Sequence, residues 1–153
     1  MYPPALAEII ELFEHLPEEE KRENLIVFAD QAAGCAPREG ETYDLVDKRK
    51  DEECTDTVTV HLSVDAERRS RFAIELGPHV QTLTRAMAAI LCKGLNGSTP
   101  DEVMAVEQDF VPRIVGSTLV RVRSQSVYYI LTRMKSSAKV WLNRERAASG
   151  AVG

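Results

Sequence analysis

The sequence predicts an α+β fold in which a small antiparallel sheet packs against an N-terminal helix pair and C-terminal helices. Apolar residues recur at three- and four-residue steps within residues 4–33 and again from residue 123, as in amphipathic helices. Between these regions, residues 57–65 and 69–76 alternate apolar and polar side chains, as strands with one buried face do. The 153 residues suit one domain, which we place at 1–145, followed by a flexible tail at 146–153.

The N-terminal helix pair is expected over residues 4–15 and 16–33. One face of the first helix is apolar, and it consists of Leu6, Ile9, Ile10 and Phe13. The second helix opens with Pro17 and three glutamates, which suit a helix start because proline fits the first turn and acidic groups complement the helix dipole. A glycine and a proline end this helix, and residues 35–53 are expected to form a polar, charged loop.

The two predicted strands are joined by a short connection that is typical of an antiparallel hairpin. The inward side chains of the first strand are Val58, Val60, Leu62 and Val64. His61 alternates with them, so it is expected on the exposed face. Residues 77–94 then predict a helix that Gly94 closes.

The C-terminal half begins with the sequence "STPDEVMAV". Thr99 as N-cap, Pro100 and Glu102 form a capping box that predicts a helix start. A final long helix is expected from about Arg123, with an inward set of Val127, Ile130, Leu131, Met134 and Trp141. A solvated basic face is expected from Arg133, Lys135, Lys139, Arg144 and Arg146.

The bulk composition restricts the class of protein. Three cysteines are an odd number in a domain of a size that needs no disulfides, which favours a reducing, cytoplasmic location. The N-terminus lacks the pattern of a signal peptide, and no apolar run is long enough to span a membrane. The net charge of −5 argues against a general nucleic-acid-binding protein.

Cys54 stands out because seven consecutive charged residues, 47–53, run directly into it. His61 cannot be a local base for this thiol, because seven extended residues span roughly 23 Å and an odd offset points the side chains to opposite faces. No CxxC or HxxxH spacing occurs, so no metal site is predicted; a zinc site from Cys35, Cys54 and His79 would have to assemble through folding alone. Cys92 lies within an apolar helical pattern and is expected to be buried.

The order of elements resembles that of the SufE family over roughly residues 3–137. The opening "PPALAEIIELFEHL" is similar to the start of the family's helix pair, and "GLNGSTPDEVMAV" to its glycine–leucine and Thr/Ser-Pro helix start. "VRSQSVYYILTRMK" is similar to the C-terminal segment, in which an arginine and an Asn/Gln precede a basic helix. This resemblance implies a SufE/IscU-like fold.

The family's acceptor cysteine lies in a Gly-Cys-Gln-Ser-x-Val-Trp motif before the first strand of its hairpin. The matching stretch here is "ECTDTVT", residues 53–59, in which the cysteine and the valine agree and the other motif residues differ. The resemblance therefore implies Cys54 as the sulfur acceptor. Partner docking or loop support is implied for Glu53, Thr55, Asp56, Arg123 and Gln125.

The resemblance implies a carrier that takes persulfide sulfur from a SufS-like cysteine desulfurase onto Cys54 and stimulates that enzyme. The sulfur would pass to SufBCD-like iron–sulfur scaffold proteins. No cofactor is implied on this chain, because pyridoxal phosphate belongs to the desulfurase. The altered motif leaves open a regulatory module that docks on a desulfurase without carrying sulfur, and an independent Cys-dependent hydrolase or metalloenzyme is a third interpretation.

Acidic residues flank Cys54 more closely than basic residues do. The acidic set is Asp51, Glu52, Glu53 and Asp56, and the basic set is Lys48, Arg49 and Lys50. Because neighbouring negative charge disfavours a thiolate, we expect an ordinary or raised pKa for Cys54 in the free protein. Thiolate formation would then depend on the partner's site.

Overall fold

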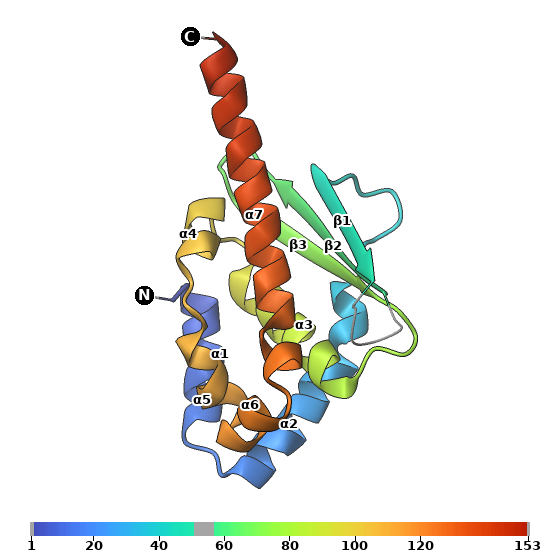
Figure 1. The fold of residues 1–153 in the computed structure, drawn as a ribbon, viewed down its shortest axis with the longest axis vertical. Helices are drawn as coiled ribbons and strands as arrows, with labels where there is room; N and C mark the ends of the chain where they lie inside the picture. Colours follow the sequence, from blue (N-terminus) through green and yellow to red (C-terminus); the bar gives the residue numbers. More distant parts are fainter. Residues whose placement is uncertain (1, 51–56, 153) are drawn as a thin grey trace.

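The computed structural model describes residues 2–50 and 57–152 of the chain. The elements of the first half are α1 (Pro4–Glu14), α2 (Glu18–Asp30), η1 (Ala32–Cys35), β1 (Leu45–Lys50), β2 (Thr57–Val64) and β3 (Ser70–Leu76). Those of the second half are α3 (Thr82–Leu95), α4 (Pro100–Ala105), η2 (Gln108–Phe110), α5 (Val111–Val115), α6 (Ser117–Val122) and α7 (Ser124–Val152). Helices and sheet form two packed layers, which confirms the predicted α+β class (Figure 1).

The N-terminal helix pair forms as predicted. Its apolar face is buried, with exposed fractions of at most 6% for Leu6, Ile9, Ile10 and Phe13. Both α1 and α2 pack against α3, the helix at the centre of the molecule (Figure 1). The apolar spacing in the sequence was therefore sufficient for α1; in α2 it holds for Leu25, Phe28 and Ala29, which are buried, but Ile26, expected on the same face, is 54% exposed.

The sheet within the described residues has the order β1–β2–β3 and is antiparallel throughout. The hairpin of β2 and β3 is confirmed, with Val60 opposite Ile74. The expected loop at 35–53 is wrong in part, because residues 45–50 form the edge strand β1, in which Leu45 pairs with Leu62. Charged side chains are common on edge strands, where they discourage pairing with other chains.

Helix α3 continues past the glycine that was expected to end it. Gly94 lies inside the helix, and a Cβ at this position would stand 3.0–3.2 Å from atoms of Leu6. The glycine therefore permits close packing of α1 on α3. Asn96 follows the helix, and its side-chain oxygen accepts a hydrogen bond from the amide of Phe72 at 2.8 Å.

The predicted capping box of α4 is confirmed. The Glu102 amide donates to the Thr99 hydroxyl at 3.1 Å, and the Glu102 carboxylate accepts from the Thr99 amide at 3.4 Å. Three short segments, η2, α5 and α6, then lead to α7. These segments were not assigned from the sequence, because each has too few residues to show a helical period.

Helix α7 begins at Ser124, as expected, and its C-terminal part projects beyond the sheet (Figure 1). Residues 146–152 continue the helix, and the flexibility expected for them stays a prediction. Arg68, in the turn between β2 and β3, ties the hairpin to the C-terminal half: it pairs with Asp101 at 2.6 Å and with Glu145, and its guanidinium lies 5.4 Å from the Trp141 ring centroid. In the described part of the chain, no helix combines the length and apolarity needed to cross a membrane.

Candidate functional site

Cys54 and its neighbours Glu53, Thr55 and Asp56 lie outside the described residues. In the sequence they belong to residues 51–56, which join β1 to β2. Lys50 and Thr57 stand on either side of this stretch and are opposite each other in the strand register. The connection that contains Cys54 therefore leaves and re-enters the sheet at one end of a single hairpin.

Arg133 of α7 holds β1 and β2 next to this connection, although a solvated position was expected for it. That expectation is wrong, because Arg133 is only 2% exposed. Its guanidinium donates to the carbonyl oxygen of Asp47 in β1 at 2.7 Å and to that of Val58 in β2 at 3.0 Å. It also donates to the Tyr129 hydroxyl at 2.8 Å and pairs with the Asp47 carboxylate at 3.4 Å.

These contacts explain why an arginine is stable in the interior. Burying a charge is costly unless it is paired and hydrogen-bonded, and the planar guanidinium meets several acceptors at once. Because Arg133 bonds to both strands, it fixes them to α7 close to the Cys54 connection; Val58 is two positions after residue 56. Arg49 adds a contact from β1 to α7 by donating to the Ser136 hydroxyl at 3.3 Å.

The remaining residues of the expected basic face divide into two groups. Lys139, Arg144 and Arg146 are exposed, as predicted. Lys135 is partly buried and donates to the carbonyl of Val106 at 2.7 Å, so it joins α7 to the end of α4.

Arg123 and Gln125 lie at the corner between α6 and α7, and both are exposed. The Arg123 amide closes α6 by donating to the Leu119 carbonyl at 2.7 Å. The corner lines a hollow of about 240 Å³ together with Val122, which is 67% exposed. Gln125 precedes Arg133 by eight positions on the same helix, or about 12 Å at the α-helical rise.

The start of α2 positions this corner. The Glu18 carboxylate accepts hydrogen bonds from the Thr118 amide at 3.4 Å and hydroxyl at 3.0 Å, and these bonds lower the pKa of Glu18. Gly116, just before α6, has a φ of +88° and lies against this carboxylate, so a side chain there would be strained and crowded. Glu18 thus acts as a remote N-cap for α6, a contact for which the sequence has no local signal.

Comparison with protein families gives a match to SufE, described as an Fe-S metabolism associated domain, over residues 7–138. The chain belongs to the SufE family. A curated relative, the cysteine desulfuration protein SufE of Plasmodium vivax, is 25% identical over 145 residues. The match covers 94% of this chain and 57% of that relative's length.

Two solved structures share the fold of this SufE-family chain. The solution structure of a hypothetical protein from Thermus thermophilus has a TM-score of 0.68 at 24% identity, covering 94% of this chain and 99% of the other. The crystal structure of the N-terminal part of a nitrogen-fixing NifU-like protein from Brucella abortus has a TM-score of 0.52 at 20% identity, covering 73% and 90%. Both confirm the SufE/IscU-like architecture.

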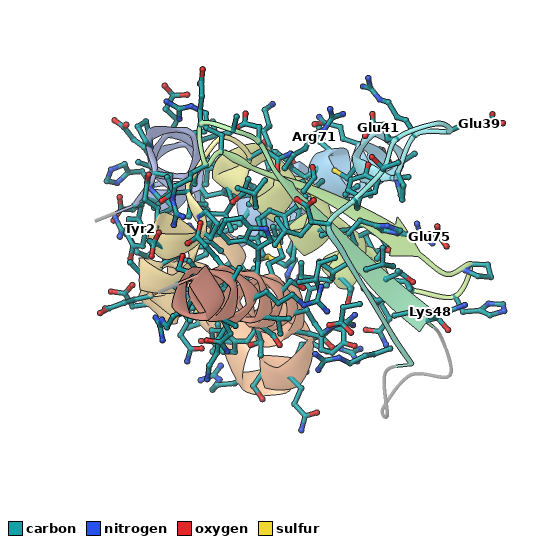
Figure 2. All side chains as sticks on the ribbon, turned by 90° about the horizontal axis from the view of Figure 1, so that it is seen from above. Tyr2, Glu39, Glu41, Lys48, Arg71 and Glu75 are labelled. Carbon is teal, nitrogen blue, oxygen red and sulfur yellow. The ribbon has the colours of Figure 1, made fainter. Side chains whose placement is uncertain are left out.

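His61 was expected on the exposed face of the sheet of this SufE domain, but its imidazole ring is covered. Its two ring nitrogens are buried and have no hydrogen-bond partner among the described residues, and burial lowers its pKa. The cover is Tyr43, whose ring centroid lies 5.0 Å from that of His61. Tyr43 donates to Glu41 at 2.7 Å, and Glu41 pairs with Arg71 at 3.0 Å; Glu41 and Arg71 are both labelled in Figure 2.

Both the zinc site considered above and the Cys-dependent hydrolase depend on Cys54, which lies outside the described residues. Within residues 2–50 and 57–152, no three His, Cys, Asp or Glu side chains are grouped to hold a metal ion. Cys92 is 3% exposed, which confirms its predicted burial, and Cys35 is half-buried.

Proposed function

We propose that this SufE-family protein accepts persulfide sulfur from a cysteine desulfurase at Cys54 and passes it to iron–sulfur assembly proteins. The observation that carries the proposal is the family match over residues 7–138, a range that contains Cys54. The name of the Plasmodium vivax relative, a cysteine desulfuration protein, supports the same chemistry. A SufS-like desulfurase, stimulated on docking, and a SufBCD-like scaffold are the proposed partners, in the cytoplasm.

The transfer needs one nucleophilic thiol and no cofactor on this chain. The Cys54 thiolate attacks the outer sulfur of the desulfurase persulfide, the sulfur–sulfur bond breaks, and the desulfurase cysteine leaves as a thiolate. Cys54 then carries the persulfide until an acceptor thiol takes the outer sulfur in the same way. The pyridoxal phosphate that releases sulfur from free cysteine belongs to the desulfurase.

The surrounding structure supports this role in two ways. Arg133 fixes the strands on both sides of the Cys54 connection, and reactive groups on loops work best when a rigid scaffold holds the loop ends. The exposed corner of Val122, Arg123 and Gln125 offers an apolar, a cationic and an amide group for contact with a partner. We assign docking or loop support to this corner and to Glu53, Thr55 and Asp56.

One observation favours a second candidate. Glu53, Thr55 and Asp56 occupy positions at which the SufE motif has other residues, and two of them, Glu53 and Asp56, add negative charge beside the thiol. This altered stretch is also compatible with a regulatory module that binds a desulfurase without accepting sulfur.

Mass spectrometry with a cysteine desulfurase, pyridoxal phosphate and free cysteine tests both candidates. The carrier predicts one added sulfur on the Cys54 peptide, absent in Cys54→Ala and unchanged in the control Cys35→Ala. The measurement is paired with a binding titration of each variant. Binding of the desulfurase without added sulfur at Cys54 would overturn the carrier and support the regulatory module; the absence of both would overturn both.

A further inference from the structure

His61 of β2 has a titratable ring whose two nitrogens are buried beneath another side chain. Neither nitrogen has a hydrogen-bond partner among residues 2–50 and 57–152. The Tyr43 ring lies against the imidazole, with 5.0 Å between the ring centroids and 58° between the ring planes. The neutral imidazole therefore leaves one donor and one acceptor unused in the folded protein, which is uncommon for buried polar groups.

The cover lies over the β2–β3 half of the outer sheet face, the face to which His61 points. Ala73 of β3 stands opposite His61 and is only 4% exposed. Val46 of β1 stands opposite His61 on the other side and is 56% exposed. Residues directly opposite each other in an antiparallel pair share a face, so the cover reaches β3 and leaves β1 open.

Tyr43 belongs to residues 36–44, which join η1 to β1 without helix or strand and which we call the strap. Side chains hold the strap on the sheet. The Glu41 carboxylate pairs with Arg71 of β3 at 3.0 Å and accepts from the Tyr43 hydroxyl at 2.7 Å. Next to β1, a carboxylate oxygen of Asp44 accepts from the amide of Val64 in β2 at 2.8 Å.

The charged groups around His61 offer its ring no hydrogen bond. They come from β1, β3 and the strap, and they are Lys48, Glu75, Arg71, Glu41 and Asp44. Glu75 favours the charged imidazole, but burial acts more strongly and lowers the pKa of His61. A proton on the covered ring would create two buried N–H donors and a positive charge without an acceptor, which is costly unless water reaches them.

We propose that protonation of His61 releases the strap from the outer face of the sheet. The proton comes from the solvent, and once Tyr43 has moved away, water can hydrate both N–H groups of the imidazolium. The opening is local, because β2 stays paired with β1 and β3 on its two sides while the strap is held by side chains. The strap is thus an acid-sensitive element of the free protein, independent of sulfur transfer at Cys54.

Amide hydrogen exchange, followed by NMR and corrected for the intrinsic rate at each pH, tests the proposal. The Val64 amide reports on the strap because it donates to Asp44. Below pH 6.5, the ordinary pKa of histidine, its protection should fall by up to about tenfold per pH unit, because the open form binds a proton that the closed form excludes. The amides that pair β2 with β3 should keep their protection.

Three variants separate the contributions. His61→Phe keeps a ring but has no titratable nitrogen, so the protection of the Val64 amide should no longer fall below pH 6.5. His15→Phe is the matched control, because His15 is exposed, and it should respond as the natural chain does. Tyr43→Ala removes the cover, so NMR titration of the His61 ring should show its pKa moving back towards the ordinary value.

Four results would overturn the proposal. They are constant Val64 protection in the natural chain, an equal fall in His61→Phe, a simultaneous fall throughout the β2–β3 ladder, and an unchanged pKa of His61 in Tyr43→Ala. An equal fall in His61→Phe would assign the response to the carboxylates of Asp44 and Glu41. Thermal unfolding verifies that each variant is folded, and should His61→Phe fail to fold, the ring titration in Tyr43→Ala decides.

Discussion

Two buried cations hold two different regions of the molecule. Lys21 in α2, 7% exposed, joins α1 to α5: its ammonium donates to the carbonyl oxygens of Phe13 at the end of α1 and Arg113 in α5. Arg133, 2% exposed, joins the sheet to α7 through the carbonyl oxygens of Asp47 and Val58. Each therefore links two elements that are distant in sequence through main-chain acceptors.

The two sites differ in how the positive charge is compensated. Lys21 contacts the carbonyl ends of short helices, which carry partial negative charge, while Glu14 and Glu18 act on it at longer range. The sheet has no comparable dipole, and there the Asp47 carboxylate pairs directly with Arg133. In this fold the partial negative charge of helix ends balances the buried lysine, whereas a full carboxylate, that of Asp47 in β1, balances the buried arginine.

The largest effect is expected for Arg133→Met. It would leave two strand carbonyls and Asp47 without their partner, and we expect a loss of about 3 kcal/mol in the free energy of unfolding. Urea unfolding measures this loss. Arg133→Lys keeps the charge but not the fork of donors, so it should recover only part of the stability. Full recovery with lysine would mean that charge alone, and not the geometry of the guanidinium, holds the strands.

A smaller effect is expected for Lys21→Met, about 2 kcal/mol, because two carbonyl groups lose a donor but no contacting carboxylate is left unpaired. Burial lowers the pKa of Lys21 from 10.5, so between its native pKa and 10.5 the unfolded chain binds more protons. Its contribution is therefore complete above pH 10.5 and falls as the pH drops through the native pKa. Unfolding of both proteins over this range should show their stability difference growing with pH. A constant difference would contradict the burial effect.

The smallest effect is expected for His61→Phe, within about 1 kcal/mol, because the ring stays and two unpartnered buried nitrogens are removed. Burial lowers the pKa of His61 below 6.5, although Glu75 opposes this. The histidine's contribution is complete above pH 6.5 and is lost as the pH falls through the native pKa. Urea unfolding on both sides of pH 6.5 should show a smaller loss for the variant than for the natural chain. Equal losses would place the pH dependence elsewhere.

The sequence alone was enough to predict those elements that carry a regular apolar spacing or a clear capping pattern. The helix faces of α1 and α7, the hairpin of β2 and β3 and the capping box at Thr99 all follow from local patterns that the structure confirms. The strand β1 was missed because its run "LVDKRK" is charged, and on an edge strand the pairing with β2 determines the structure more than the side chains do.

The candidate site was harder to predict from local sequence patterns. Arg133 follows Ile130 by three positions and precedes Ser137 by four, and both neighbours are buried, so helical spacing did contain a signal for its burial. The acceptors in β1 and β2 that stabilise it are distant in sequence and could not be inferred. His61 was misplaced for the same reason, because its cover, Tyr43, comes from a segment without a regular period. Cys54 itself depends on the family resemblance, and its role stays a proposal.

The contact between Arg68 and Trp141 has a practical consequence for optical experiments. Trp141 is the only tryptophan in the chain, and it lies where the hairpin turn meets α7. Indole emission is therefore a natural reporter of this junction. A change in emission that precedes the loss of helical circular dichroism would show α7 separating from the hairpin before the rest of the domain unfolds.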